Sequence, residues 1–165
     1  MIKLIVLDVD GTLTDGKITY DSNGVETKSF DVKDGMAIAS WTKKFGLQAA
    51  IITGRKSSIV EKRAKELDIK HLHQGVHNKD EVLENILKEE NITWKNVAAI
   101  GDDLNDYKML SKAHLSFCPA DAVDSIKNIV KVVCIKNGGE GAVREMIEYI
   151  FKLEGNEDKL LELWA

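Results

Sequence analysis

The stretch Leu4-Ile5-Val6-Leu7-Asp8-Val9-Asp10-Gly11-Thr12-Leu13-Thr14 decides the fold of this chain. Its four leading apolar residues are typical of a strand that is buried on both faces of a parallel sheet. Gly11 then ends the strand, and ligands of open α/β sheets bind just beyond such carboxyl ends. Asp8 and Asp10 are two residues apart, so in extended backbone their carboxyls leave the same face, with Cα atoms roughly 6–7 Å apart. This spacing favours two carboxyls that act on opposite sides of one small group.

The composition is that of a globular domain. The chain has 165 residues, of which 44% are hydrophobic and 30% charged, which predicts a single domain over residues 1–165 with a sizeable core. A net charge of −4 offers no basic face suited to nucleic acid. We expect no signal peptide and no membrane span, because the apolar run at 2–7 is too short, and a cytoplasmic location is the default. Cys118 and Cys134 lack metal or redox spacing.

Strand-like and helix-like segments alternate along the chain. This order predicts an α/β fold, a three-layer α/β/α sandwich with a mostly parallel Rossmann-like sheet and no cap domain. The expected strands are 4–7, 48–52, 71–73, 97–100, 114–117 and 130–135. The first expected helix is opened by 34–35 and closed by Gly46, and the next two are opened by capping boxes at 58–61 and 78–81. Three more are expected: one capped by Asp103, one near 123–128, and one after 138–141 that runs through Ile150.

Two parts of the chain lie outside this alternation. The runs 17–20 and 25–30 flank Asp21-Ser22-Asn23-Gly24 and predict a β-hairpin over about 16–31. It lies between the first strand and the first helix, so we expect it to project from the sheet edge. The charged tail, about 155–165, ends near Trp164, which either packs on a neighbour or stays loose.

Three of the expected strands end in polar clusters. The carboxyl ends of parallel strands lie along one edge of the sheet, so these clusters are expected to meet. Lys79, at the first position of a helix, adds an ammonium group and a helix N-terminus, the usual environment of a bound phosphate. Clustered aspartates repel one another unless a cation is present, and with oxygen ligands alone that cation is Mg²⁺. The clusters are Asp8/Asp10, Thr53/Arg55 and Asp102/Asp103.

These residue types point to phosphoryl transfer onto a carboxylate. In this hypothesis Asp8 attacks phosphorus and forms an aspartyl-phosphate, which water then hydrolyses. Asp10 protonates the leaving oxygen and later activates the water. Lys79 and Mg²⁺ offset the charge of the phosphoryl oxygens, to which Thr53 donates a hydrogen bond. The competing interpretation is a set of helix caps and solvated turns.

The ordered set of motifs resembles the haloacid dehalogenase superfamily. The matching residues are Asp8-Val9-Asp10-Gly11-Thr12, Thr53, Lys79, and Gly101-Asp102-Asp103 followed by Asp106. The resemblance implies that Asp8 is the nucleophile and Asp10 the general acid and base. It also implies that Mg²⁺ is held by the Asp8 side chain, the Asp10 main-chain carbonyl and Asp102. Asp103 or Asp106 would support this site.

A narrower set of motifs resembles the capless 3-deoxy-D-manno-octulosonate 8-phosphate phosphatases. These motifs are Thr14-Asp15-Gly16, 30–35, 51–55, Gln74-Gly75, 101–104 and 138–145. The likeness implies hydrolysis of that sugar acid phosphate for the inner core of lipopolysaccharide, by a homotetramer whose hairpins and neighbouring subunits cover the site. Substrate contacts implied by the likeness are Asp10, Asp31, Val32, Lys33, Asp34, Gly35, Arg55, Arg63 and Lys79, with Arg63 contributed by a neighbouring subunit.

Several alternatives remain open at this point. Arg55 favours the octulosonate ester, because relatives that act on nononate 9-phosphates usually carry glutamate there. Ala39 departs from the pattern, because many octulosonate enzymes have arginine at this position. The rivals are therefore a nononate or acylneuraminate 9-phosphate phosphatase, a broad small-phosphate phosphatase, and a phosphomutase, which usually needs a cap. A non-catalytic oligomerisation module, as in sugar-acid cytidylyltransferase fusions, is the rival from a different class.

Other candidate residues have structural interpretations of similar weight. Arg63 lies at the edge of an apolar helix stripe, where arginine either snorkels or faces an interface. His71, His73 and His77 have no acid or cysteine partner at matching spacing, so ordinary strand and loop histidines are favoured over a metal site.

Overall fold

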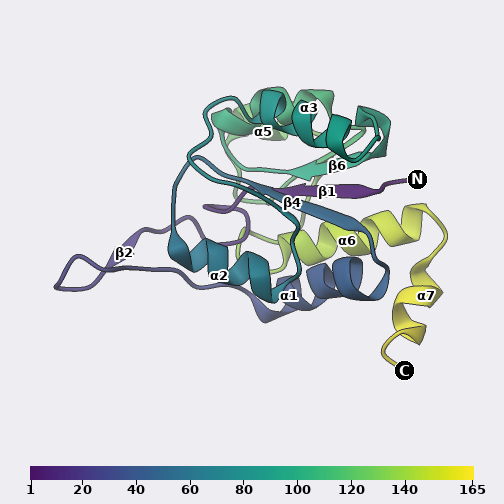
Figure 1. Ribbon diagram of the computed structural model, residues 1–165, viewed down its shortest axis with the longest axis horizontal. Helices are drawn as coiled ribbons and strands as arrows, with labels where there is room; N and C mark the ends of the chain where they lie inside the picture. The colour runs from purple at the N-terminus through teal and green to yellow at the C-terminus, as the bar shows by residue number, and fades with distance from the viewer.

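A six-stranded sheet runs through the middle of the molecule (Figure 1). The computed structural model describes all residues, Met1–Ala165. Every neighbouring pair of strands in this sheet is parallel. In spatial order the strands are β5 (His71–His73), β4 (Gln48–Ile52), β1 (Leu4–Leu7), β6 (Val97–Ile100), β7 (Leu115–Cys118) and β8 (Val132–Val133).

Helices cover both faces of the sheet, which confirms the three-layer sandwich. One layer contains α1 (Val32–Ala39), which continues into a π-helix (Ser40–Lys44), α2 (Ser58–Glu66) and α6 (Ala142–Leu153). The other layer contains α3 (Lys79–Glu89), α4 (Tyr107–Lys112) and α5 (Asp124–Lys127). The 3-10 helices Trp94–Asn96 and Leu104–Asp106 lie on either side of β6 in sequence. No helix combines the length and the apolar character that crossing a membrane requires.

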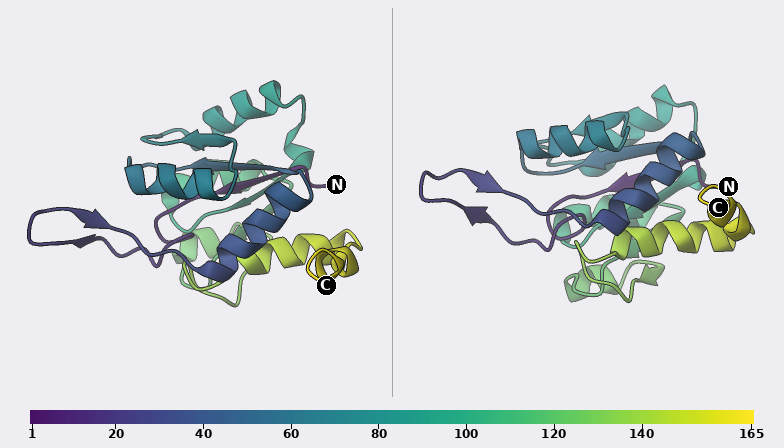
Figure 2. Two further views of the ribbon diagram at one scale, coloured as in Figure 1. Left: turned by 60° about the horizontal axis from the view of Figure 1, so that its bottom comes forward. Right: turned by 90° about the horizontal axis from the view of Figure 1, so that it is seen from below.

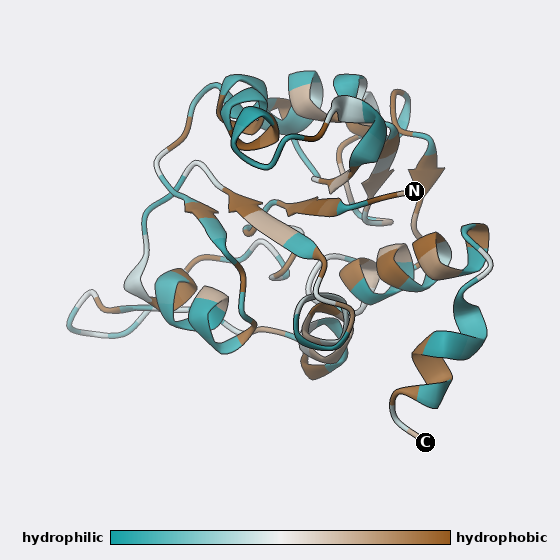
Figure 3. Ribbon diagram, turned by 45° about the vertical axis from the view of Figure 1, so that its right-hand side comes forward, coloured by the Kyte–Doolittle hydropathy of each residue, from teal (hydrophilic) through white to brown (hydrophobic).

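The position of β1 between two helical layers explains its unbroken apolar sequence. Ile5 and Leu7 belong to the apolar cluster under α1, α2 and α6, whereas Leu4 and Val6 belong to the cluster under α3, α4 and α5. Because side chains alternate along a strand, a strand between two helical layers needs apolar residues at every position. Coloured by hydropathy, the ribbon shows this apolar sheet between helices of mixed character (Figure 3).

The predicted hairpin is present and projects away from the sheet and its helices (Figure 2). Its strands β2 (Thr19–Tyr20) and β3 (Glu26–Thr27) are antiparallel but have only two residues each, shorter than the expected 17–20 and 25–30. Asp21 Oδ1 accepts hydrogen bonds from the backbone N–H groups of Asn23 and Val25, which forms the turn.

Several predicted helix starts were displaced or differently capped. The first helix begins at Val32, not at Asp34, because Asp31 caps it by accepting from the N–H groups of Lys33 and Asp34. The predicted capping box at 58–61 is wrong: Ser57 is the N-cap, since its extended backbone lets Oγ accept from Ile59 N at 3.2 Å. In the second predicted box, Asn78 is the N-cap residue but its side chain makes no capping hydrogen bond.

The later elements are also shifted from their predicted positions. Strand β7 begins and ends one residue after the expected 114–117, β8 has two residues instead of six, and α5 is shorter than 123–128. The tail beyond Gly155 forms a further helix, α7 (Glu157–Glu162). Trp164 packs on its own chain, donating a hydrogen bond from Nε1 to Ser40 Oγ at 3.0 Å, with Lys44 over its ring. Of the two alternatives for Trp164, the loose one is therefore wrong.

Candidate active site

The carboxyl ends of β4, β1 and β6 meet at one cavity of about 150 Å³. These three strands are neighbours in the sheet, with Leu7 paired to Ile51 on one side and to Ile100 on the other. The three predicted polar clusters therefore do come together. The residues that line the cavity are Asp8, Asp10, Thr53, Gly54, Arg55, Asp102, Asp103 and Asn105.

The turn after β1 holds the two aspartates in place. Asp8 N continues the sheet by donating to Ile100 O at 3.2 Å. Val9 O accepts from the backbone N–H groups of residues 12–14. Gly11 has φ +92°, and a Cβ there would lie 2.0 Å from Asp102 Oδ2. Only glycine meets both demands, because an L side chain would be strained and would push into the Asp102 carboxylate. The glycine therefore lets the β1 and β6 acids approach each other.

Lys79 links these acids from the side of α3. Its side chain is 1% exposed, and Nζ lies 2.6 Å from Asp8 Oδ1 and 2.6 Å from Asp106 Oδ1. The other Asp106 oxygen accepts from the N–H groups of Asp102 at 3.0 Å and Asp103 at 3.3 Å. Asp106 therefore fixes both the ammonium group and the loop after β6, and its two oxygens are already engaged.

Burial makes the clustered carboxyls costly to ionise. It raises the pKa of Asp8 to about 7, although the Lys79 ammonium works in the opposite direction. Burial likewise raises the pKa of Asp102 to about 6, and that of Asp106 to about 6 with the nearby Asp8 charge adding to the effect. One carboxylate oxygen of each residue lies within 4.8 Å of the others. Such a group is stabilised in its ionised form by a cation.

The donor set fits Mg²⁺. The ligands offered are oxygens alone, which suits a hard divalent cation. Asp8 and Asp102 face the cavity, whereas Asp106 is engaged with Lys79 and the backbone. The fit therefore favours Asp8 and Asp102 as ligands and gives Asp106 a supporting role.

Thr53 and Arg55 extend the site from the end of β4. Thr53 is buried, and its backbone is fixed on both sides, with N donating to His73 O at 2.9 Å and O accepting from Val76 N at 3.0 Å. Arg55 is more exposed, and its Nη2 lies 3.1 Å from Glu26 Oε1 of the hairpin. The hydrogen bonds that Arg55 donates to Tyr20 and Glu26 raise the pKa of Arg55.

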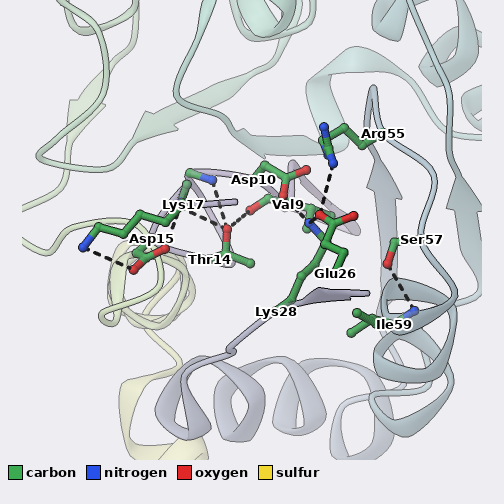
Figure 4. A network of polar contacts seen from close by, with 12 residues as sticks. Val9, Asp10, Thr14, Asp15, Lys17, Glu26, Lys28, Arg55, Ser57 and Ile59 are labelled. Carbon is green, nitrogen blue, oxygen red and sulfur yellow. Dashed lines mark hydrogen bonds and ion pairs between the residues drawn. The ribbon is translucent and has the colours of Figure 1, made fainter. Parts of the chain in front are cut away.

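Sequence reasoning missed Gly54 and Asn105, which line the cavity, and Lys28 of the hairpin, which contacts the cavity residue Asp10. The Lys28 side chain is 2% exposed, and Nζ lies 2.5 Å from Asp10 Oδ1 and 3.1 Å from Glu26 Oε1 (Figure 4). Burial alone would lower the pKa of Lys28, but the hydrogen bonds with Asp10 and Glu26 raise it. The only sequence signal for Lys28 was the spacing of Glu26 and Lys28, which places both on one face of a strand.

The segment 31–35, expected as a substrate-binding loop, is the N-cap and first turn of α1. None of its residues lines the cavity at Asp8. Asp34 is buried and accepts from Arg144 N at 2.8 Å, so its carboxylate lies at the start of α6. Burial raises the pKa of Asp34 to about 6.

Arg63 also lies outside the cavity of its own chain. Its guanidinium is 5.4 Å from the Phe30 ring centroid and 3.4 Å from Glu66 Oε2. A Cβ at Gly35 would lie 2.3 Å from Arg63 Nη2, so this glycine makes room for the arginine over α1. Arg63 and the exposed residues of 31–35 thus form one surface outside the cavity at Asp8, whereas Asp34 and Gly35 of that segment are buried.

The histidine expectation needs one correction. His71 and His73 lie in β5 as expected, but His71 does have an acid partner, since its Nε2 is 2.7 Å from Glu90 Oε1. Lys70 Nζ contacts the same oxygen at 2.5 Å. The C-terminal end of α3 returns beside β5, a long-range contact that residue spacing does not reveal. Lys70, His71 and Glu90 therefore form one polar cluster at the edge strand β5.

Comparison with known proteins places the chain in a family. Residues 71–147 match the model of haloacid dehalogenase-like hydrolases. The chain is 40% identical over 158 residues to 3-deoxy-D-manno-octulosonate 8-phosphate phosphatase KdsC of Escherichia coli K12, which covers 96% of this chain and 84% of that protein. The corresponding Haemophilus influenzae protein is 38% identical over 154 residues, covering 93% of this chain and 85% of the relative.

Solved structures agree with this relationship. The Moraxella catarrhalis 3-deoxy-D-manno-octulosonate 8-phosphate phosphatase, crystallised with a magnesium ion, a phosphate ion and KDO, has a TM-score of 0.95 and 40% identity, covering 99% of this chain and 94% of that one. The cobalt-bound Haemophilus influenzae enzyme has a TM-score of 0.89 and 38% identity, covering 94% of this chain and 91% of that one. The chain is therefore a member of the haloacid dehalogenase-like hydrolases and belongs, among them, to the family of the 3-deoxy-D-manno-octulosonate 8-phosphate phosphatases.

Proposed function

We propose that this chain is a Mg²⁺-dependent phosphatase that hydrolyses 3-deoxy-D-manno-octulosonate 8-phosphate through an aspartyl-phosphate on Asp8. The observation that carries the proposal is the buried contact of Asp8 with Lys79, at 2.6 Å, beside Asp102 and Thr53. The family relationship supports the substrate, and Arg55 at the rim of the cavity supports an anionic one.

The residues divide the reaction into two steps. In the first, an Asp8 carboxylate oxygen attacks phosphorus, the bond from phosphorus to the sugar oxygen breaks, and Asp10 gives that oxygen a proton. In the second, Asp10 takes a proton from water, the water oxygen attacks phosphorus, and the bond to Asp8 breaks to release phosphate. Lys79 and Thr53 donate to the phosphoryl oxygens in both steps.

Asp8, Asp102 and the main-chain carbonyl of Asp10 would hold Mg²⁺, whose positive charge would offset the repulsion between the substrate phosphate and the acids. Asp106 keeps Lys79 and the loop after β6 in position for this arrangement. Asp103 supports the same loop, since its side chain accepts from Leu104 N at 2.7 Å.

We further propose a single-domain, cytoplasmic homotetramer that serves lipopolysaccharide inner-core synthesis. In this assembly the surface formed by 31–35 and Arg63 meets the sugar acid in the cavity of a neighbouring subunit. The support for this is the family relationship and the position of that surface, which lies outside the cavity of its own chain.

Phosphate release from matched substrates tests the proposed activity. We expect higher kcat/KM on 3-deoxy-D-manno-octulosonate 8-phosphate than on a nononate 9-phosphate, and loss of both activities when Mg²⁺ is chelated. The nononate ester is included because Ala39 stands where many octulosonate enzymes have arginine. A clear preference for the nononate ester would overturn the substrate assignment, and release that is unaffected by chelation would overturn the metal assignment.

A further inference from the structure

We propose that Lys28 is a positioning residue for Asp10, so that the hairpin of each chain is part of its own active site. This inference rests on the proposed function, in which Asp10 moves the proton. Lys28 directly follows β3, and its Nζ donates to Oδ1 of the cavity residue Asp10 at 2.5 Å (Figure 4). It lies 18 residues beyond Asp10 in sequence.

The Asp10 carboxylate has no other hydrogen-bond donor in the chain. The backbone N–H groups that follow it are already used, since those of Thr12, Leu13 and Thr14 donate to Val9 O and that of Gly11 points to Thr14 Oγ1 at 3.3 Å. An aspartate in a turn commonly accepts from such groups, but here they are turned inward. The orientation of the Asp10 side chain is therefore set by Lys28.

Lys28 is itself held in place. Its side chain is 2% exposed, and Glu26 Oε1 accepts from Nζ at 3.1 Å. Glu26 also contacts Arg55 Nη2 at 3.1 Å, so the chain of contacts begins at the end of β1 and ends at the loop after β4. The Lys28 ammonium, held between Asp10 and Glu26, donates to Oδ1 of Asp10. The other Asp10 oxygen stays available for the leaving oxygen of the substrate.

The alternative is that Lys28 only anchors the hairpin to the domain. The positioning role and the anchoring role differ in how the loss of kcat/KM in a Lys28 variant depends on the leaving group of the substrate. A sugar alkoxide needs a proton from Asp10 as it departs, whereas p-nitrophenolate leaves without one. Because kcat/KM covers the steps up to the departure of the leaving group, a misplaced Asp10 lowers it for the alkyl ester far more than for the aryl ester.

The test compares Lys28→Met with the unchanged enzyme on the sugar acid phosphate and on p-nitrophenyl phosphate. We expect kcat/KM to fall about 10–100-fold on the alkyl ester and less than about 3-fold on the aryl ester, the scale of a general-acid contribution. Lys28→Arg restores part of the loss, because it keeps a donor at this position. Lys17→Met is the matched control, since Lys17 is an exposed lysine of the same hairpin whose only acid partner is Asp15 at 3.9 Å.

An equal loss on both esters, or no loss on either, overturns the inference. Thermal unfolding of each variant shows whether the fold is retained, and Lys28→Arg keeps the comparison usable if Lys28→Met unfolds. Failure of the proposed function gives a different result, because the unchanged enzyme would then leave the sugar acid phosphate intact. In that case the same comparison is made on whichever alkyl phosphate the enzyme does hydrolyse.

Discussion

Lys79 and Asp106 form a buried ion pair, with Nζ 2.6 Å from Oδ1, although the two residues come from different helices. The Asp106 side chain is 0% exposed and its second oxygen accepts from Asp102 N at 3.0 Å. Asp8, the proposed nucleophile, shares the same ammonium group. Lys79 is therefore held by one acid that lines the cavity, Asp8, and by one that does not, Asp106.

Asp106→Ala should destabilise the fold and weaken catalysis together. It removes one partner of a buried charge pair and leaves the N–H groups of Asp102 and Asp103 without an acceptor, so we expect the free energy of unfolding to fall by about 3 kcal/mol. Urea unfolding measures this change. Asp124→Asn, at an exposed position in the first turn of α5, is the control and should change stability by less than about 0.5 kcal/mol. Equal stability of both variants would contradict the role given to Asp106.

Mg²⁺ affinity should weaken as the pH falls from 8 to 5.5. The metal-free pKa values are about 7 for Asp8 and about 6 for Asp102. Because ligands bind metal in their ionised form, protons compete with Mg²⁺ below these values. Calorimetric titration at several pH values measures the dependence. An affinity that stays constant across this range would show that these carboxyls do not hold the metal.

The stability of the metal-free protein should change with pH in the opposite direction. The native pKa values of Asp8, Asp102 and Asp106 lie above their ordinary value of 3.8. Between about pH 4 and 7 the folded chain therefore holds more protons than the unfolded chain, so these groups lower the free energy of unfolding as pH rises. Saturating Mg²⁺ should restore about 2.7 kcal/mol at 100 times its Kd. Thermal unfolding with and without Mg²⁺ at pH 5 and 7.5 tests both statements, and a Mg²⁺ effect no larger at pH 7.5 would contradict them.

Gly11→Ala should damage the metal site specifically. The new Cβ would lie 2.0 Å from Asp102 Oδ2, so the carboxylate must move, and we expect Mg²⁺ to bind at least about 10-fold more weakly. Gly24→Ala is the matched control, because Gly24 also has a positive φ, +76°, but has open space around it. Both variants carry a backbone strain of roughly 1 kcal/mol, and only Gly11→Ala should lose metal affinity. Equal metal affinity in the two variants would contradict the close approach of β1 and β6.

Mixing two inactive variants tests the proposed contribution of Arg63 across subunits. Asp8→Asn lacks the nucleophile and Arg63→Ala lacks the proposed substrate contact. If Arg63 serves a neighbouring cavity, co-refolded mixtures contain sites with both an intact Asp8 and an intact Arg63, and should recover part of the activity. Arg144→Ala in place of Arg63→Ala is the control. Mixtures no more active than their separate components would restrict Arg63 to its own chain.

The sequence predicted the sheet and the core of the site because both depend on local patterns. Apolar runs followed by acids, as at Asp8 and Asp102, mark buried strands and their carboxyl ends, and parallel topology brings those ends together. The position of Lys79 at the start of α3 follows equally from a local pattern, although Asn78 does not cap with its side chain.

What the sequence did not reveal depends on contacts between distant residues. Lys28 meets Asp10 only because the chain returns from the hairpin past the end of β1, and His71 meets Glu90 only because α3 ends beside β5. Trp164 finds Ser40 across 124 residues. The choice of Ser57 over Ser58 as N-cap also escaped prediction, because adjacent serines satisfy the same pattern.

The most direct test of the account is Mg²⁺-dependent phosphate release from 3-deoxy-D-manno-octulosonate 8-phosphate by Asp8→Asn. The change preserves the size of the side chain and its cavity position but removes the nucleophilic carboxylate. We predict a fall in kcat of at least about 10³-fold, with thermal unfolding that shows an intact fold. Asp21→Asn, in the exposed hairpin turn, should keep full activity. Phosphate release by Asp8→Asn at a rate close to that of the unchanged enzyme would contradict the assignment of Asp8 as the nucleophile.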